Sequence, residues 1–298
     1  MTENKMTQKI GLVNMKNTLF AGALGTLLFA SACGSEQKAA FQKDFPADEV
    51  LEISMDISSW DIKISASNDK KIHVSYNGKK KDERKAQVMQ KGQTLMIQQQ
   101  DEDDKTIAGQ FSFREAGKVT LSIPKDHAVL LDIQNDSGEI ALDGVTLSKL
   151  SLDNRSGYVF LSDMAVKNAS FISDSGDIKM TDSKCTDSDI QTKSAYVTIK
   201  NTELGKAAVL TDSGEVGIQN INAYKSLLVE TGSGDISLSH KTAPDNLSYT
   251  ISSGSDDITA QFKNAAYTMD TDGCKQGAIG KGKRDLSIKS DSGTLIVK

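Results

Sequence analysis

Asp136-Ser137-Gly138-Glu139-Ile140 is the stretch of sequence that decides the fold, because close copies of it return at nearly constant spacing through the rest of the chain. The copies are Arg155-Ser156-Gly157-Tyr158-Val159, Asp174-Ser175-Gly176-Asp177-Ile178, Lys193-Ser194-Ala195-Tyr196-Val197, Asp212-Ser213-Gly214-Glu215-Val216, Gly232-Ser233-Gly234-Asp235-Ile236, Gly254-Ser255-Asp256-Asp257-Ile258 and Asp291-Ser292-Gly293-Thr294-Leu295. From serine to serine the first four steps are 19 residues each, and the next two are 20 and 22. The last step, of 37 residues, divides into 18 and 19 if Asp272-Gly273-Cys274 is a degenerate copy. A fixed period of this length indicates a stacked repeat architecture.

Apolar residues recur at fixed offsets inside each repeat. The first pairs after the corners are Ile140 and Leu142, Val159 and Leu161, Ile178 and Met180, Val197 and Ile199, Val216 and Ile218, and Ile236 and Leu238. The last pairs before the corners are Leu150 and Leu152, Ala169 and Phe171, Ser188 and Ile190, Ala207 and Val209, Leu227 and Val229, Tyr249 and Ile251, Tyr267 and Met269, and Leu286 and Ile288. Between them lies a third site, at Leu147, Val166, Cys185 and Leu204.

This pattern predicts two firm strands and a weaker third strand per repeat. The strands are separated by polar corners, where Ser-Gly permits a backbone angle that larger residues resist. A single repeat cannot cover its own apolar face, whereas stacked repeats bury one continuous core. We therefore expect an all-β parallel β-solenoid with turns of about 19–22 residues.

The main competing fold is an antiparallel meander or sandwich in which each repeat is a hairpin. The corner charges favour the solenoid, because stacking at the ~4.8 Å strand spacing places residues of alternating sign in one column. That column is Asp136, Arg155, Asp174, Lys193 and Asp212, and the column beside it is Glu139, Tyr158, Asp177, Tyr196 and Glu215. A meander gives no reason for an alternation over two repeats.

The composition agrees with an all-β protein and bounds the function. The 298 residues include three prolines and 23 glycines, and the formal net charge is -5. A surface of this charge does not suggest nucleic-acid binding, because neutralising phosphates requires a dense basic patch.

The N-terminal segment, residues 1–32, is expected to be a signal peptide outside the fold. Two lysines precede an apolar run that is too short to span a bilayer, and the run stops at Cys33. Ala30-Ser31-Ala32-Cys33 resembles a bacterial lipobox, and this resemblance implies a lipid anchor on Cys33. The alternative is an ordinary secretion signal that is cleaved nearby. We expect a tether at 33–49, a solenoid domain at 50–298, and lipid anchoring to the outer face of the bacterial cell membrane.

The repeated serines do not predict catalysis. A serine nucleophile needs a base within hydrogen-bond reach, and the only histidines, His73, His127 and His240, do not recur with the serines. The nearest approach to a calcium loop, Asp270-Thr271-Asp272-Gly273, lacks the first aspartate and the closing glutamate. We therefore predict no enzyme activity, no metal and no cofactor. Cys185 and Cys274 are expected to remain free, since they lie more than four turns apart, roughly 20 Å at the strand spacing.

The corners ending in Ser-Gly-Asp/Glu-Ile/Val, the strand from Val119 to Pro124 and the glycine-rich run from Gly277 to Gly282 resemble the bacterial "putative adhesin" family. The resemblance covers roughly residues 50–298. It implies a right-handed β-solenoid in an exported or membrane-tethered protein, and it brings no established catalytic motif. Lys193-Ser194-Ala195 departs from the pattern at the glycine.

A binding role at the cell surface is the predicted function. The candidate binding surface consists of Arg155, Tyr158, Lys193 and Tyr196, because aromatic and cationic residues dominate the energetics of interfaces. Residues 79–105 are a second candidate, as a loop projecting from a rigid scaffold. The expected partners are the membrane, through the lipid on Cys33, and a protein or glycan ligand. Two alternatives stay open: an envelope-stress sensor or regulator that acts on a membrane partner, and a carbohydrate-active β-helix enzyme.

Overall fold

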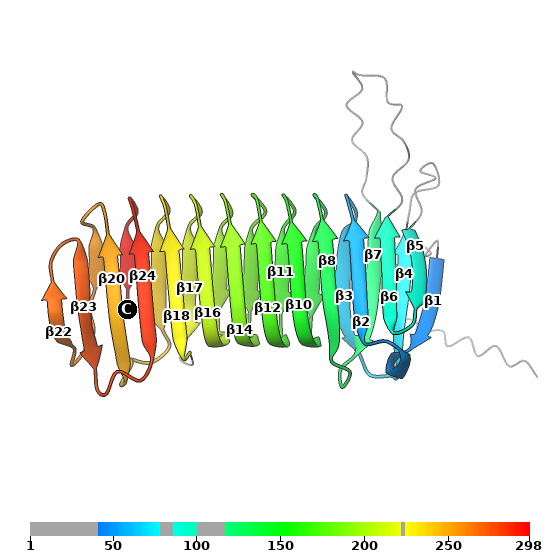
Figure 1. Cartoon of the computed structure of the whole chain (residues 1–298), viewed down its shortest axis with the longest axis horizontal. Coiled ribbons are helices and arrows are strands. Elements are labelled where there is room, and N and C mark those ends of the chain that lie inside the picture. The colour runs from blue at the N-terminus through cyan, green and yellow to red at the C-terminus, as the bar shows by residue number, and fades with distance from the viewer. Residues whose placement is uncertain (1–40, 78–85, 100–116, 222–223) are drawn as a thin grey trace, which may run out of the picture. The chain divides into compact units, whose positions relative to one another are not determined.

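Two β-sheets face each other across one apolar core in the computed structural model (Figure 1). The structure describes residues 41–77, 86–99, 117–221 and 224–298, and the segment Gln37–Lys298 forms one compact unit. The one helical element among the described residues is a short 3-10 turn, Ala47–Glu49. None of the described residues belongs to a helix that is long and apolar enough to cross a membrane.

Sheet A contains twelve strands. In spatial order they are β1 (Phe41–Pro46), β4 (Lys71–Asn77), β7 (Lys118–Pro124), β3 (Asp61–Ser67), β9 (Ile140–Asp143), β11 (Val159–Ser162), β13 (Ile178–Thr181), β15 (Val197–Lys200), β17 (Val216–Ile221), β19 (Ile236–His240), β25 (Leu295–Val297) and β21 (Ile258–Ala260).

Sheet B contains thirteen strands. In spatial order they are β22 (Ala266–Asp270), β23 (Cys274–Ile279), β20 (Leu247–Ser253), β24 (Asp285–Ser290), β18 (Ser226–Thr231), β16 (Glu203–Thr211), β14 (Lys184–Thr192), β12 (Ala165–Ser173), β10 (Thr146–Asn154), β8 (Val129–Asn135), β2 (Glu52–Ile57), β6 (Thr94–Gln99) and β5 (Ala86–Lys91).

The middle of the chain forms regular parallel turns, which confirms the predicted all-β solenoid. Each turn contributes a short strand to sheet A and a longer strand to sheet B, and equal offsets in successive turns pair with each other. Val159, for example, pairs with Ile140 on one side and Ile178 on the other. The predicted third strand is not separate, because Leu147 and its equivalents lie at the start of the nine-residue strands of sheet B.

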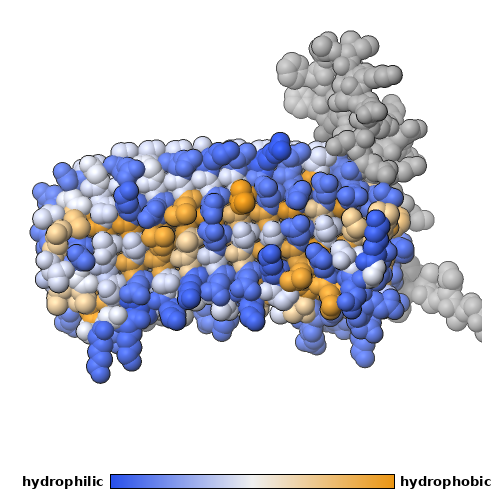
Figure 2. All heavy atoms as spheres, viewed as in Figure 1, coloured by the Kyte–Doolittle hydropathy of each residue, from blue (hydrophilic) through white to orange (hydrophobic). Residues whose placement is uncertain are grey.

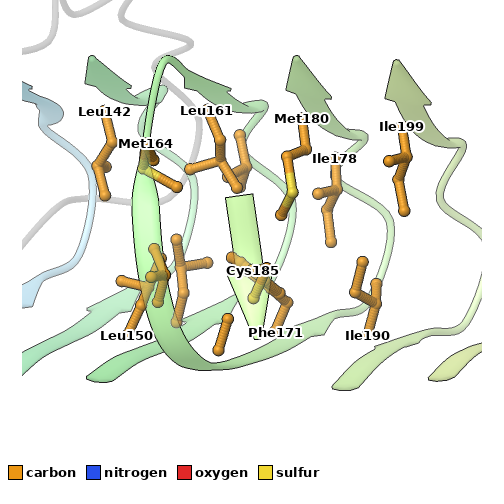
Figure 3. Close-up of a cluster of buried hydrophobic side chains, with 14 of the residues drawn as sticks. Leu142, Leu150, Leu161, Met164, Phe171, Ile178, Met180, Cys185, Ile190 and Ile199 are labelled. Atoms are coloured by element: carbon orange, nitrogen blue, oxygen red, sulfur yellow. The ribbon is translucent and has the colours of Figure 1, made fainter. Parts of the chain in front are cut away.

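The core consists of the inward side chains of both sheets, as predicted from the fixed offsets. Figure 3 shows Leu161 and Met180 from sheet A above Phe171 and Ile190 from sheet B, and all four are almost fully buried. Each such side chain contributes about 1.5–3 kcal/mol of transfer free energy when it leaves water. Cys185 lies in the same core, and both it and Cys274 are free, as expected.

The glycine at the Ser-Gly corners is required by close stacking of the backbone and not, as predicted, by an unusual backbone angle. These glycines do not have positive φ. A Cβ on Gly157 would lie 1.9 Å from the carbonyl oxygen of Gly138, and a Cβ on Gly176 would lie 2.0 Å from that of Gly157. The backbones of these corners therefore stack too closely for a side chain, although the column does hold one methyl group. Ala195 occupies this column and is fully buried.

The buried residue three positions before each glycine completes the corner. At most corners its side-chain oxygen accepts a hydrogen bond from the glycine N–H: the distance is 2.7 Å at Asn135, 2.9 Å at Thr211 and 2.9 Å at Thr231. This side chain satisfies a buried backbone donor that has no partner in the strands. At Gly157 the side-chain amide of Asn154 instead donates to the glycine carbonyl. In the sequence this feature is visible as a polar residue at the end of each long strand of sheet B.

The opposite corner of each turn is the one that needs left-handed backbone geometry. Positive φ recurs at a spacing of 19 residues, at Gly144, Asp163, Asp182, Asn201 and Asn220. Glycine, asparagine and aspartate are the residue types that tolerate this region best. The side-chain amide of Asn201 donates to Asp182 Oδ1 at 2.9 Å, and that of Asn220 donates to Asn201 Oδ1 at 3.1 Å. This second periodic column was not predicted.

The two ends depart from stacking in chain order. Near the N-terminus, β2 lies between β6 and β8, and β3 lies between β7 and β9. Near the C-terminus, β24 lies between β18 and β20, and β25 lies between β19 and β21. The first and last pairs of parallel strands are thus inserted one position inward from the ends of the parallel stack, and antiparallel strands lie beyond those ends.

Antiparallel strands occupy the ends of the stack, which corrects three predictions. Residues 272–274 are not a degenerate corner, because β22 and β23 form an antiparallel hairpin around them. Tyr267 and Met269 are consequently 41% and 45% exposed rather than inward. Residues 41–49, predicted as part of the tether, contribute β1 and the 3-10 turn, and residues 86–99 of the predicted loop form β5 and β6.

Candidate functional site

The predicted binding surface lies at the Ser-Gly corners, on the rim where sheet B passes into sheet A. Arg155 and Lys193 follow the ends of β10 and β14, and Tyr158 and Tyr196 precede β11 and β15. The two corners are separated by one intervening turn, so their equivalent residues lie about 10 Å apart at the strand spacing. The structure thus brings the four residues to one rim, with Asp174 and Asp177 between them.

The two cations are already paired with carboxylates of the preceding turn. Arg155 Nε lies 3.2 Å from Asp136 Oδ1, and Lys193 Nζ lies 2.6 Å from Asp174 Oδ1. The hydrogen bond that Lys193 donates to Asp174, together with the negative charge of Asp174, raises the pKa of Lys193. The predicted alternation of charges is confirmed, and it stabilises the stack. Such pairs leave these cations less available to a ligand.

The tyrosine rings are the part of this surface that remains open. Tyr158 is 55% exposed and Tyr196 is 52% exposed. Phe160, which the sequence did not single out, stacks on Tyr158 with ring centroids 6.2 Å apart and is 40% exposed. The structure therefore enlarges the predicted surface to an aromatic strip of three rings, Tyr158, Phe160 and Tyr196.

A groove on the outer face of sheet B was not predicted. It has a volume of about 410 Å³ and crosses β10, β12, β14, β16 and β18. Its floor lies where the residue two positions before Phe171 and its equivalents is small in three successive turns, at Ala169, Ser188 and Ala207. The flanking turns have Leu150 and Leu227 at the same offset. This change from large to small residues can be read directly from the sequence at that offset.

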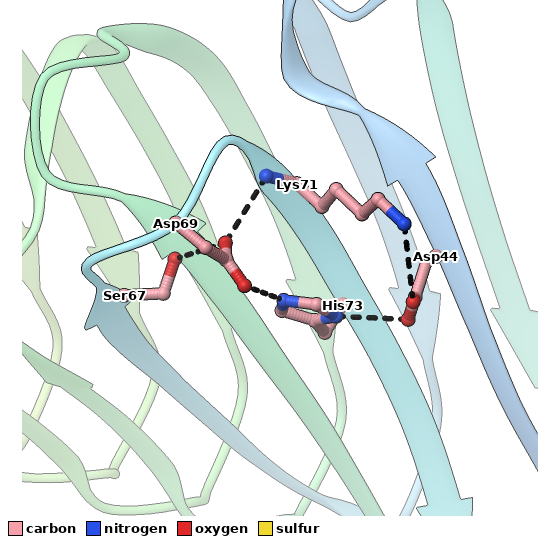
Figure 4. Close-up of polar contacts among 5 residues, drawn as sticks. All are labelled: Asp44, Ser67, Asp69, Lys71 and His73. Carbon is pink, nitrogen blue, oxygen red and sulfur yellow. Dashed lines mark hydrogen bonds and ion pairs between the residues drawn. The ribbon is translucent and has the colours of Figure 1, made fainter. Parts of the chain in front are cut away.

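His73 lies in a polar cluster near the N-terminal end, between two carboxylates (Figure 4). Its Nδ1 is 2.8 Å from Asp44 Oδ1 of β1, and its Nε2 is 2.6 Å from Asp69 Oδ2. Burial alone would lower the pKa of His73, but hydrogen bonds to the two carboxylates outweigh it and raise the pKa. Backbone hydrogen bonding to Lys71 and the bond to His73 lower the pKa of Asp69. The cluster fastens β1 to the sheet.

The other two histidines also have structural partners. His127 Nε2 lies 2.7 Å from the carbonyl oxygen of Val50. His240 contacts the Tyr224 hydroxyl at 2.9 Å and the carbonyl of Lys298 at 3.0 Å, and burial lowers its pKa. In the described ranges no histidine is bonded to a serine hydroxyl, and no three His, Cys, Asp or Glu side chains are grouped to hold a metal ion.

Cys33 and the predicted signal peptide lie outside the described residues, as do 79–85 and 100–105 of the second candidate. Burial raises the pKa of the Cys185 thiol to about 11, so this cysteine is an inert core residue.

Comparison with a solved structure supports the fold. A "putative adhesin" of Bacteroides fragilis NCTC 9343 is 16% identical, with a TM-score of 0.50 over 88% of this chain and 97% of that chain. A "putative lipid binding protein" of Parabacteroides distasonis ATCC 8503 is 14% identical, with a TM-score of 0.48 over 86% and 96% of the two chains. No curated protein matches the chain.

The predicted family resemblance is confirmed by a family model as well. That model describes the Toastrack DUF4097 family, and it matches residues 50–298, which hold every Ser-Gly corner and nearly all of both sheets. The chain therefore belongs to the Toastrack DUF4097 family.

Proposed function

We propose that the protein is a non-catalytic binding protein displayed at the cell envelope, with a lipid on Cys33 as its anchor. This proposal rests on one observation, which is that repeated polar residues form hydrogen bonds within the corners. Ser156 Oγ donates to the carbonyl of Asp136 at 2.9 Å, and Gly214 N–H donates to Thr211. Several of the repeated serines and threonines thus bond to the backbone of the corners.

The surface that remains is suited to contact with another molecule. The exposed rings of Tyr158, Phe160 and Tyr196 stand on a rigid scaffold of paired strands, so little conformational entropy is lost when they bind. Aromatic residues of this kind are enriched among those that dominate binding energy. The likeness to the solved structure of a "putative adhesin" supports the same class of function.

The anchor is tested by fractionation of cells that express the full chain. Wild-type protein is expected in the membrane fraction, and Cys33→Ala is expected in the medium or the soluble envelope fraction. Two acyl chains give stable attachment, whereas a chain without lipid has no comparable membrane affinity. Retention of Cys33→Ala on the membrane would contradict the proposed anchor.

The binding role is tested by adhesion of intact cells. Cells that lack the protein are expected to lose attachment to matrix-coated or glycan-coated surfaces, and the wild-type gene is expected to restore it. Tyr158→Ala with Tyr196→Ala should restore attachment less well than the control Thr198→Ala, which changes an outward residue of sheet A. Release of reducing sugars from a polysaccharide panel would contradict the non-catalytic role. A deletion phenotype limited to envelope-stress signalling would contradict adhesion.

A further inference from the structure

The groove on sheet B combines a floor of small residues with one polar wall and one mixed wall. Ala169, Ser188 and Ala207 form the floor. One wall consists of Lys149, Asn168, Asp187 and Lys206, and the other of Ser170, Asp189, Ala208 and Leu228. Because the lining residues come from five neighbouring strands, the groove is about 19 Å long, at ~4.8 Å per strand spacing. Figure 2 shows this face of the solenoid, with an apolar band between rows of hydrophilic side chains.

The polar groups of the first wall are unpaired, unlike the cations at the corners. Lys149, Asn168, Asp187 and Lys206 make no side-chain hydrogen bond or ion pair with the protein in the described structure. Asp187 and Lys206 are direct neighbours in the register of β14 and β16, yet they form no ion pair. In the second wall, Asp189 accepts a hydrogen bond from Gln191 at 2.9 Å. The first wall therefore presents free donors and acceptors along the groove.

We infer that this groove binds a linear glycan of neutral sugars that lies along the solenoid axis. A pyranose ring has an apolar C–H face and a rim of hydroxyl groups. Ala169 and Ala207 suit the apolar face, and the amide, carboxylate and ammonium groups of the walls suit the hydroxyl rim. About four rings fill the groove, if each covers roughly one strand spacing of ~4.8 Å. This inference rests on the proposed binding function and names the class of ligand.

Other occupants fit the groove less well. An extended peptide gains its affinity by pairing with a free sheet edge, and the backbone under the groove is already paired in the middle of sheet B. A nucleic acid would bring phosphates against Asp187 and Asp189. An acyl chain would leave the unpaired charges of Asp187 and Lys206 without partners and part of its own surface in water.

The test is calorimetric titration of the full chain carrying Cys33→Ala with neutral linear hexasaccharides of glucose, mannose, xylose and N-acetylglucosamine. Asn168→Ala and Asp187→Ala each remove hydrogen bonds to the sugar and are expected to weaken binding about tenfold or more. Ala208→Arg fills the groove from its wall and is expected to abolish binding. Ser237→Arg places the same side chain at an exposed position of sheet A and is expected to leave the affinity within about twofold of the parent.

All four substitutions are at outward-facing positions, and unchanged thermal unfolding would show that each variant is folded. Failure of every hexasaccharide to bind the parent would overturn the inference. Binding that survives Ala208→Arg would place the sugar elsewhere and overturn the assignment to the groove. Dimerisation of the parent that Ala208→Arg abolishes, without sugar binding, would identify the groove as a contact between two copies. Cell fractionation and cell attachment test the proposed function, whereas calorimetry tests the groove. The proposed function and the glycan inference can therefore fail independently.

Discussion

The middle of the solenoid and its two ends use the same kind of strand in different orders. Between β9 and β19 every turn stacks on the turn that precedes it in the chain. At the ends, β2 with β3 and β24 with β25 are inserted between turns that lie elsewhere in the sequence, and antiparallel strands complete the stack. The middle is thus held by local repetition, whereas the ends are held by contacts between distant segments.

This difference shows how a stack of repeats can be brought to an end. A regular parallel stack would expose the edges of two sheets, and exposed edges recruit further strands. Here the outermost strand of sheet B, β22, carries a register shift between Tyr267 and Met269. A shift of this kind disrupts an edge as a template for pairing. Inserting the last strands inward also keeps the C-terminal strand from fraying at the end of the stack.

The largest expected effect comes from breaking the close stacking of corners in the middle. Gly157→Val should destabilise the protein by more than about 3 kcal/mol, because its Cβ would lie 1.9 Å from the carbonyl oxygen of Gly138. Chemical denaturation measures the change. The matched control is Gly217→Val in β17, where the nearest atom to the new Cβ is Ser237 Oγ at 3.7 Å, and it should stay within about 0.5 kcal/mol of wild type. Equal losses in both variants would refute the close-stacking explanation.

A smaller loss is expected from removing one buried hydroxyl at a corner. Thr231→Val keeps the shape of the side chain but leaves the N–H of Gly234 without its acceptor at 2.9 Å. An unsatisfied buried donor costs about 1–3 kcal/mol, and denaturation curves should show a loss in that range. Thr198→Val, at an outward position of β15, should be close to neutral. A neutral Thr231→Val would mean that water or backbone movement replaces the lost bond.

At the N-terminal end we expect a weak dependence of stability on pH. His73 has a raised pKa in the folded protein, so its contribution is fully present below the ordinary value of 6.5 and is lost as pH rises through the raised pKa. Asp69 has a lowered pKa, so its contribution is present above 3.8 and is lost as pH falls through the lowered value. Because these groups are partly exposed, the His73 contribution should stay below about 1 kcal/mol.

Hydrogen exchange of β1 and β4 between pH 6 and pH 8.5 would measure the His73 effect, at pH values chosen around the ordinary histidine pKa of about 6.5. Exchange corrected for its intrinsic pH dependence should become faster at the higher pH in the wild type and should not change with pH in His73→Gln. The strands β13 and β15 of the middle provide the internal reference. A pH response in the middle equal to that at the end would rule out His73 as its source.

The smallest effect is expected from the charged column of the middle. Arg155→Ala breaks the ion pair with Asp136 and should cost only about 0.2–1 kcal/mol, since both groups are exposed to solvent. The difference from wild type should shrink further in concentrated salt. A loss that is larger and independent of salt would show that the Arg155 side chain packs, rather than pairs, at the corner.

The regular middle could be predicted from sequence because each repeat carries its own signal. The offsets of Val159 and Leu161 fix the inward positions, and the alternation of Asp136 and Arg155 fixes the parallel register. The ends could not be predicted in this way. Nothing local in β24 indicates that it pairs with β18 and β20, because that choice depends on which apolar edges the rest of the chain leaves open.

The site was predictable in part. The exposure of Tyr158 and Tyr196 follows from their place in the corner, but their neighbour Phe160 was hidden among strand residues. The groove could not be predicted, because the repeat offsets identify Ala169, Ser188 and Ala207 only as inward positions. The groove that these small residues line becomes apparent only when the three turns are stacked side by side.

The insertion of the last strand pair is tested most directly by disulfide formation between engineered cysteines. Ser237 and Ile296 are register neighbours in β19 and β25, and Ile296 and Thr259 are neighbours in β25 and β21. With Cys33, Cys185 and Cys274 replaced by serine, the 237–296 pair and the 259–296 pair should each oxidise readily. The 237–259 pair should not, because those residues lie two strand spacings, about 10 Å, apart and a disulfide needs about 7 Å or less. The 259–296 pair forms in either order and serves as the positive control. Rapid oxidation of the 237–259 pair, without oxidation of the 237–296 pair, would show that the turns stack in chain order and would contradict the inserted ends.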